Sequence, residues 1–151
     1  MSKKPLIIGI ESSCDETAAS LITENELGIP VVLSNIISSQ IDVHKKFGGV
    51  VPELAARSHM EKIDWIVQKA IDDSGVKIEE IDAVASTAGP GLVVCLSVGL
   101  SFGKAFAVSI NKPFIAVNHL EGHALSPKLN STLNYPYLLL LISGGHSQFL
   151  N

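Results

Sequence analysis

The sequence is poor in cysteine and in aromatic residues. Its 151 residues include only two cysteines, and aromatic side chains make up 5%. Cys14 and Cys95 lie far apart and form no CxxC pair, so no disulfide framework is indicated and two reduced thiols of a cytosolic protein are expected. The hydrophobic share of 46% excludes a disordered chain, and the low aromatic content predicts a mostly aliphatic core.

An excess of positive charge is absent as well. The chain has 11 Lys and Arg residues against 15 Asp and Glu residues, for a formal net charge of -4. It therefore carries no basic footprint for nucleic acid, and this segment alone is expected to bind RNA poorly. No apolar run reaches the ~18 residues of a membrane span. The run at residues 6–10 is too short for a signal peptide, so a cytoplasmic protein without membrane contact is expected.

The first half of the sequence predicts an antiparallel meander followed by a helix. Apolar runs at residues 6–10, 18–22 and 31–38 predict three strands, with a hairpin turn at 24–30 and a loop at 44–49. Pro52 fits the first position of a helix, and Gly75 fits its C-terminal cap. Between them, apolar residues at helical spacing predict one buried stripe, made of Ile63, Ile66, Val67, Ala70 and Ile71.

The second half alternates strands and helices. Strands are expected at residues 81–87 and 114–117, a buried core helix rich in small residues at 92–109, and a short helix at 119–129 that ends around Pro127. A polar segment predicts a boundary, so residues 1–132 form subdomain I and residues 133–151 begin subdomain II with a hairpin of strands 137–142 and 146–150. Because the chain stops within a sheet, a fragment of a longer protein is expected.

This order of elements predicts an α/β fold. A meander followed by strand–helix units matches the N-terminal ribonuclease-H-like domain of the actin/hexokinase (ASKHA) architecture, a mixed sheet flanked by helices, here with the first hairpin of the second domain.

The strongest chemical signal is the segment HLEGH at residues 119–123. His119 and His123 are four residues apart and share one face of a helix, which is a half-site for a transition metal. The alternative is a pair of polar residues on an exposed helix. A third ligand could be a carboxylate outside this chain or one of three further histidines, His44, His59 and His146. Asn118 and Glu121 approximate a capping box, which predicts a structural role for Glu121.

The polar segment at residues 12–17 is a second candidate. Asp15 or Glu16 could hold a metal or take a proton from an attacking group, and the alternative is an ordinary hairpin turn. Cys14 is not expected to be a nucleophile, because nothing nearby would lower the pKa of its thiol. An ion pair with Glu53 would account for Arg57, whereas packing gives no role to His59.

Two glycine turns follow predicted strands, at residues 87–92 and 143–145. The first opens a helix, where backbone N–H groups favour anions, and the second allows close approach to a ligand. Neither is the phosphate loop GxxxxGK[ST], and HLEGH is not the zinc-protease pattern HExxH.

Five ordered motifs together resemble one family. They are GIESSCDETAAS at 9–20, GGVVPELAARSH at 48–59, IDAVASTAGPGL at 81–92, VNHLEGH at 117–123 and LISGGHSQ at 141–148. This set resembles the threonylcarbamoyl-adenosine synthesis enzymes, TsaD in bacteria, formerly described as O-sialoglycoprotein endopeptidases or glycoproteases.

The resemblance implies a reaction and a site. Such enzymes transfer the threonylcarbamoyl group of threonylcarbamoyl-AMP to N6 of the adenosine beside the anticodon of tRNA. By resemblance, His119 and His123 bind one divalent metal, iron or zinc, and Asp15 and Glu16 lie near the reaction centre. The matching substrate and nucleotide segment is Leu141, Ile142, Ser143, Gly144 and Gly145. The family's third metal ligand is a C-terminal aspartate that this chain lacks, so the fragment alone is expected to be inactive.

The resemblance also implies partners and leaves alternatives. Expected partners are tRNA, a paralogous scaffold subunit, an ATPase subunit and a second copy in a homodimer. The alternative functions are the non-catalytic scaffold paralogue, a kinase of the same superfold, and the metallo-glycoprotease of the older description. The scaffold and the kinase lack the HxEGH motif, and no base or nucleophile is placed for proteolysis.

Overall fold

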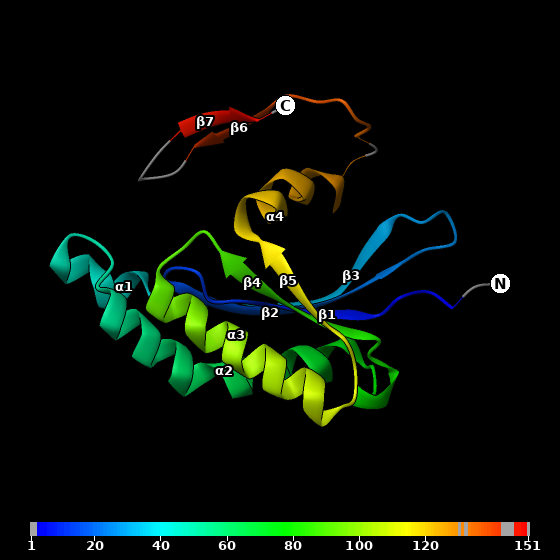
Figure 1. Cartoon of the computed structure of the whole chain (residues 1–151), viewed down its shortest axis with the longest axis horizontal. Coiled ribbons are helices and arrows are strands. Elements are labelled where there is room, and N and C mark those ends of the chain that lie inside the picture. Colours follow the sequence, from blue (N-terminus) through cyan, green and yellow to red (C-terminus); the bar gives the residue numbers. More distant parts are fainter. Residues whose placement is uncertain (1–2, 130, 132, 143–146, 151) are drawn as a thin grey trace.

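A mixed five-stranded sheet forms the centre of the molecule (Figure 1). The computed structural model describes residues 3–129, 131, 133–142 and 147–150. The strands run in the order β3-β2-β1-β4-β5, where β1 is Ile7–Glu11, β2 Glu16–Glu24, β3 Pro30–Ser39, β4 Ala83–Gly89 and β5 Phe114–Asn118. The first three pair antiparallel, and β1, β4 and β5 pair parallel. The predicted meander and mixed sheet are confirmed.

Two helices cover one face of this sheet (Figure 1). Helix α2 (Pro52–Ser74) begins with the expected proline and ends at Gly75, whose φ of 69° is the left-handed C-terminal cap. All five residues of the predicted stripe are buried, and they pack on Ile8 and Leu21 of the sheet. Helix α3 (Val93–Ser109) lies beside α2 and packs on β4. The periodicity of the sequence therefore located the core correctly.

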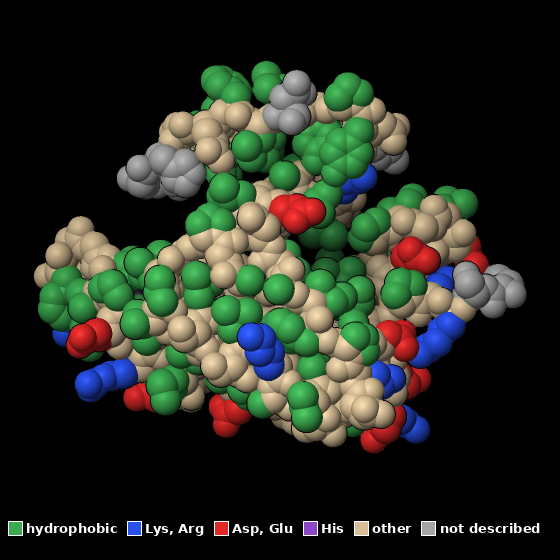
Figure 2. All heavy atoms as spheres, in the orientation of Figure 1, with side chains coloured by type: hydrophobic (Ala, Val, Ile, Leu, Met, Phe, Trp, Pro, Cys, Tyr) green, Lys and Arg blue, Asp and Glu red, His purple; other side chains and the backbone are tan. Residues whose placement is uncertain are grey.

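The description of residues 92–109 as a buried core helix is wrong. Only one face of α3 is buried, and it carries the small residues Gly99 and Gly103. On the opposite face Val93 is 76% exposed and Val108 80% exposed. Figure 2 shows apolar side chains at the surface in this region. The small side chains serve close approach to the sheet, because a Cβ atom at Gly99 would collide with Ser12.

The predicted loop at residues 44–49 is also different in the structure. Residues Ile41–His44 form the short helix α1 and Lys45–Phe47 a 3-10 turn, which ends at Gly48 with a φ of 72°. The turn forms because the carbonyl oxygen of Gln40 accepts hydrogen bonds from the N–H groups of Val43 and His44. The side chain of His44 is buried, although its immediate neighbours Val43 and Lys45 are exposed.

The remaining elements are one short helix, two 3-10 turns and a separate pair of strands. Helix α4 (His119–Leu125) directly follows β5 and continues into a 3-10 turn, Ser126–Leu129. Strands β6 (Leu139–Ile142) and β7 (Ser147–Leu150) form the predicted antiparallel hairpin. Another 3-10 turn, Ile78–Glu80, precedes β4, so that strand begins two residues later than expected. Within the described ranges, we find no helix with the length and apolar content that crossing a bilayer requires.

Candidate metal and acyl-transfer site

Three parallel strands deliver polar side chains to one edge of the sheet. Strand β1 ends at Glu11, β4 carries Thr87 near its end, and β5 ends at Asn118, directly before α4. The carboxyl ends of parallel strands lie at the same edge, which is the usual place for a ligand in an α/β fold. Glu11 and Thr87 also line a cavity of about 250 Å³ on the sheet face opposite α2 and α3.

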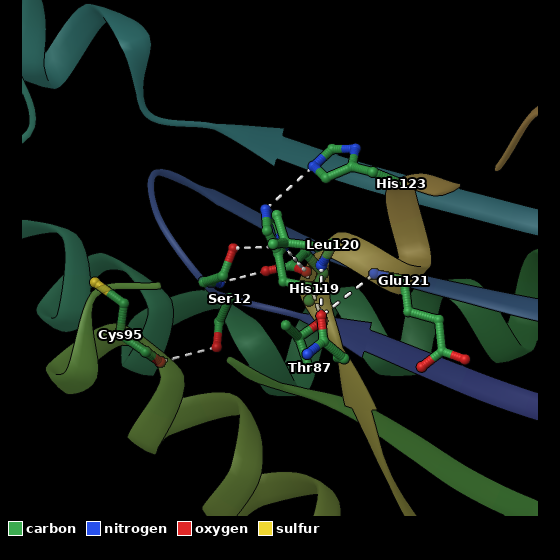
Figure 3. Close-up of polar contacts among 10 residues, drawn as sticks. Ser12, Thr87, Cys95, His119, Leu120, Glu121 and His123 are labelled. Atoms are coloured by element: carbon green, nitrogen blue, oxygen red, sulfur yellow. Dashed lines mark hydrogen bonds and ion pairs between the residues drawn. The ribbon is translucent and has the colours of Figure 1, made fainter. Parts of the chain in front are cut away.

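The two histidines of the HLEGH segment face each other on α4 (Figure 3). Their Nε2 atoms are 3.1 Å apart, and their rings meet edge to face with centroids 4.5 Å apart. The side-chain oxygen of Asn118 caps the helix by accepting the N–H groups of Leu120 and Glu121, at 2.9 and 3.3 Å. The predicted N-cap and the predicted shared face are both confirmed.

Glu11 lies at this site as well, although the sequence motifs did not single it out. Its Oε2 accepts the hydroxyl of Thr87 at 2.6 Å and lies 3.5 Å from Nδ1 of His119, while its Oε1 accepts the N–H of Ser13. Burial raises the pKa of the Glu11 carboxyl, but the hydrogen bonds from Thr87 and Ser13 and the charge of His119 outweigh it and lower this pKa. The ionised form of Glu11 is therefore favoured, next to His119 of the histidine pair. The signal in the sequence was a lone carboxylate ending an apolar strand.

The histidines proposed as a third ligand lie elsewhere. His44 donates from Nε2 to the side-chain oxygen of Gln40, 3.2 Å away, and His59 is fully buried beneath residues 12–17. His146 lies outside the described residues. The described part of the chain contains no cluster of three or more His, Cys, Asp or Glu side chains able to hold a metal. A third ligand from His44 or His59 is therefore a wrong prediction.

His59 has the packing role that the sequence did not reveal. Its Nε2 donates to the carbonyl oxygen of Cys14 at 3.1 Å, and its Nδ1 accepts the hydroxyl of Thr17 at 2.7 Å. Burial lowers the pKa of His59, so its neutral form is favoured. The ion pair expected between Arg57 and Glu53 is absent among the salt bridges of the described residues.

Other elements hold the backbone of residues 13–15. The carbonyl oxygen of Ser13 accepts the N–H of Leu92 at 2.8 Å, and that of Asp15 accepts the N–H of Gln40 at 3.0 Å. Gly91 allows this approach, because a Cβ atom there would lie 2.7 Å from the oxygen of Ser13. The N–H of Leu92, at the glycine turn predicted to favour anions, is thus already bonded within the protein.

Asp15 and Glu16 lie at the end of this loop, where β2 begins. Burial and the neighbouring charge of Asp15 raise the pKa of the Glu16 carboxyl. Among the described residues, no hydrogen bond or ion pair joins either carboxylate to His119 or His123. Burial and Asp15 also raise the pKa of Cys14 to about 11, so its thiol is a poor nucleophile, as expected.

The predicted substrate segment is described only in part. Leu141 and Ile142 end strand β6, and Ile142 is 69% exposed. Ser143, Gly144 and Gly145 lie outside the described residues.

Solved structures share this fold at low sequence identity. An uncharacterized protein with similarity to peptidase YEAZ from Pseudomonas aeruginosa gives a TM-score of 0.61 at 16% identity, over 97% of this chain and 64% of that one. YeaZ from Pseudomonas aeruginosa gives 0.54 at 16% identity, over 75% and 44%. RuvC from T. thermophilus, in complex with a Holliday junction substrate, gives 0.52 at 13% identity, over 82% and 73%. The predicted ribonuclease-H-like, ASKHA-type fold is confirmed.

Sequence comparisons identify the family. The chain is 81% identical over 151 residues to the tRNA N6-adenosine threonylcarbamoyltransferase of Pelagibacter ubique (strain HTCC1062), covering 100% of this chain and 42% of that protein. It is 55% identical over 144 residues to the enzyme of the same name from Brucella canis, covering 95% and 40%. The chain thus spans about two fifths of the length of these relatives. The family model described as TsaD: tRNA N6-adenosine threonylcarbamoyltransferase matches residues 31–151, and the chain belongs to this family.

Proposed function

We propose that this chain forms the first domain of a tRNA N6-adenosine threonylcarbamoyltransferase and carries two of its metal ligands. The reaction is transfer of threonylcarbamoyl from threonylcarbamoyl-AMP to N6 of the adenosine beside the anticodon, with release of AMP. The observation that carries the proposal is the pair of Nε2 atoms of His119 and His123, 3.1 Å apart, at the carboxyl edge of the sheet. Family membership supplies the reaction class.

The spacing of the histidine nitrogens fits a shared metal ion. Metal–nitrogen bonds of about 2.0–2.1 Å at tetrahedral angles place two ligand nitrogens about 3.3 Å apart. The observed 3.1 Å is close to this value. Imidazole suits both iron and zinc, and a carboxylate outside this chain is proposed as the third ligand. A bound ion would act as a Lewis acid on the carbonyl oxygen of the carbamoyl group.

The acidic pair is proposed to serve proton transfer. Attack by N6 on the carbamoyl carbon forms the new C–N bond, and the bond from that carbon to the phosphate oxygen of AMP breaks. One of the two hydrogens on N6 must leave as a proton. Burial and the charge of Asp15 raise the pKa of the Glu16 carboxyl, which makes its ionised form a stronger base for this proton. Leu141 to Gly145 are proposed to contact the adenylate.

Several partners belong to the same proposal. The acceptor is tRNA, and the chain's net charge of -4 indicates that other parts of the assembly supply most phosphate contacts. A paralogous scaffold subunit, an ATPase subunit and a second copy of the enzyme are the proposed protein partners, in the cytoplasm.

The test uses a chimera in which this chain replaces the matching 42% of the Pelagibacter ubique relative. The chimera is given threonylcarbamoyl-AMP and a tRNA that reads codons beginning with A, and the modified nucleoside is measured by mass spectrometry. Replacing His119 by Ala is expected to reduce the rate by about 100-fold or more, because second-sphere changes alone already cost about 10–100-fold.

Glu121→Gln is the matched control, because this carboxylate lies on the same helix and points away from the histidines (Figure 3). It is expected to keep the activity of the unchanged chimera. A chimera without activity, or a His119→Ala variant as active as the control, would contradict the proposed function.

A further inference from the structure

Two carboxylates could support the histidine pair, and only one of them is directed toward a histidine ring. Glu121 lies between the histidines in sequence, yet its carboxylate points away from both rings (Figure 3). Glu11 is 108 positions from His119 in sequence, but its Oε2 lies 3.5 Å from the Nδ1 atom of that ring. We propose that Glu11 is the positioning residue of the metal site: it accepts the Nδ1–H of His119 and so directs the Nε2 lone pair toward the ion.

Glu11 can do this because its own orientation is fixed. One carboxylate oxygen accepts the N–H of Ser13, and the other accepts the hydroxyl of Thr87 at 2.6 Å. These donors come from the loop after β1 and from β4. The carboxylate is therefore held by two donors, with Oε2 3.5 Å from Nδ1 of His119.

The contacts around His119 favour a single tautomer. If Nδ1 lacked its proton, its lone pair would face the negative charge of Glu11 at 3.5 Å, which is repulsive. With the proton on Nδ1, both Glu11 and the hydroxyl oxygen of Ser13, 3.3 Å from Nδ1, can accept it. The Nε2 atom is then an acceptor, 3.1 Å from Nε2 of His123. A carboxylate or other acceptor on the far nitrogen is the usual support of a metal-bound histidine.

The proposal rests on the proposed metal site, but its first test needs no metal. The ¹⁵N spectrum of the imidazole rings is recorded at a pH of about 8, where an unperturbed histidine is neutral. The expected result is a proton on Nδ1 of His119, against the Nε2–H form that a free histidine prefers. In Glu11→Ala the ring is expected to return toward the Nε2–H form, and in Glu121→Ala it is expected to stay unchanged. Finding Nε2–H on His119 in the unchanged chain overturns the proposal.

The second test adds Co²⁺ to the same samples. Paramagnetic broadening of the His119 and His123 signals measures binding, even where affinity is low. Glu11→Gln keeps the shape of the side chain but removes its charge, and is expected to weaken Co²⁺ binding about 10–100-fold. Thr87→Val is expected to weaken it less, because the carboxylate remains, and Glu121→Gln is expected to bind as the unchanged chain does.

The two tests distinguish failure of the proposed metal site from failure of the positioning role of Glu11. If the Nδ1–H form is present but Co²⁺ broadens neither histidine, the metal site of the proposed function is wrong, whereas the orientation of His119 by Glu11 stands. If Co²⁺ binds and Glu11→Gln binds it equally well, the positioning role is wrong and the metal site stands. Amide spectra of each variant establish that it is folded, and Glu11→Gln serves in the tautomer test if Glu11→Ala is unfolded.

Discussion

The Nε2–H of His59 donates a hydrogen bond to the carbonyl oxygen of Cys14, 3.1 Å away, and so ties helix α2 to the loop that follows β1. This carbonyl is the middle one of three. The oxygens of Ser13 and Asp15 on either side accept N–H groups of Leu92 and Gln40. Three successive carbonyls are thus bonded to helix α2 and to the residues just before α1 and α3, and the loop that carries Asp15 and Glu16 has a defined path.

Replacing His59 by Ala is expected to destabilise the chain by about 2–4 kcal/mol, because it opens a space and leaves buried polar partners without hydrogen bonds. The free energy of unfolding is measured by urea titration followed by circular dichroism. Met60→Ala is the control on the same helix. Its side chain is 68% exposed, so a change below about 0.5 kcal/mol is expected. Equal stabilities of the two variants would contradict the role given to His59.

His59 also predicts how stability changes with pH. Burial lowers its pKa in the folded chain, so below the unfolded value of about 6.5 the unfolded chain binds more protons. The free energy of unfolding is therefore expected to fall as pH decreases below about 6.5, by at most about 1.4 kcal/mol per pH unit from this group. The contribution is fully present above this range. Urea titrations at a series of pH values measure it.

His59→Gln is the control for this pH dependence, because glutamine has a similar donor and does not titrate. The difference in unfolding free energy between the two proteins isolates the histidine. A difference that stays constant between pH 7 and pH 5 would show that His59 does not contribute.

A buried hydroxyl without a partner gives a third prediction. Ser86 is 2% exposed, and among the described residues its Oγ is a buried side-chain oxygen with no hydrogen bond. Ser86→Ala is therefore expected to leave stability unchanged or to raise it slightly. Ser12 is equally buried, but its Oγ donates to the oxygen of Cys95 and accepts the N–H of Gly99. Ser12→Ala is expected to cost about 1–3 kcal/mol, and thermal unfolding of both variants makes the comparison.

Local pattern predicted most of the fold, whereas the site depended on topology. Pro52 and Gly75 mark the ends of α2 by backbone chemistry that acts within one turn, so the sequence located both. The four-residue spacing of His119 and His123 has a consequence only if a helix forms, and Asn118 starts that helix. These features are readable because their causes lie within a few residues of one another.

Glu11 and His59 were not predictable in the same way. Glu11 meets His119 because β1 and β5 both run parallel to β4, and that pairing joins segments over 100 positions apart. His59 is polar, so hydropathy gives no reason to bury it, and its partners on β2 and the preceding loop are fixed only when α2 packs on the sheet. The sequence identified the histidine pair, and the topology placed the carboxylate of Glu11 beside it.

The contact between α3 and the loop after β1 gives the last prediction. A Cβ atom at Gly99 would collide with the Oγ of Ser12 and lie 3.4 Å from that of Ser86. Ser12 cannot move away without losing its bonds to the backbone of α3, at Cys95 and Gly99. Gly99→Ala is therefore expected to destabilise the chain by about 1–3 kcal/mol, although alanine is the better helix former.

Gly122 is the matched control, because it also lies within a helix but a Cβ atom there would meet nothing within 4 Å. Gly122→Ala is expected to leave the fold intact and to stabilise α4 by about 0.5–1 kcal/mol. Urea titration of both variants shows whether helix propensity or the close contact with Ser12 determines the effect of Gly99→Ala on stability. If both substitutions stabilise the chain, helix propensity outweighs the close contact and α3 can move away from the loop. If only Gly99→Ala destabilises it, the small residues of α3 are required for that helix to reach Ser12, and through Ser12 they hold the loop beside the histidine pair.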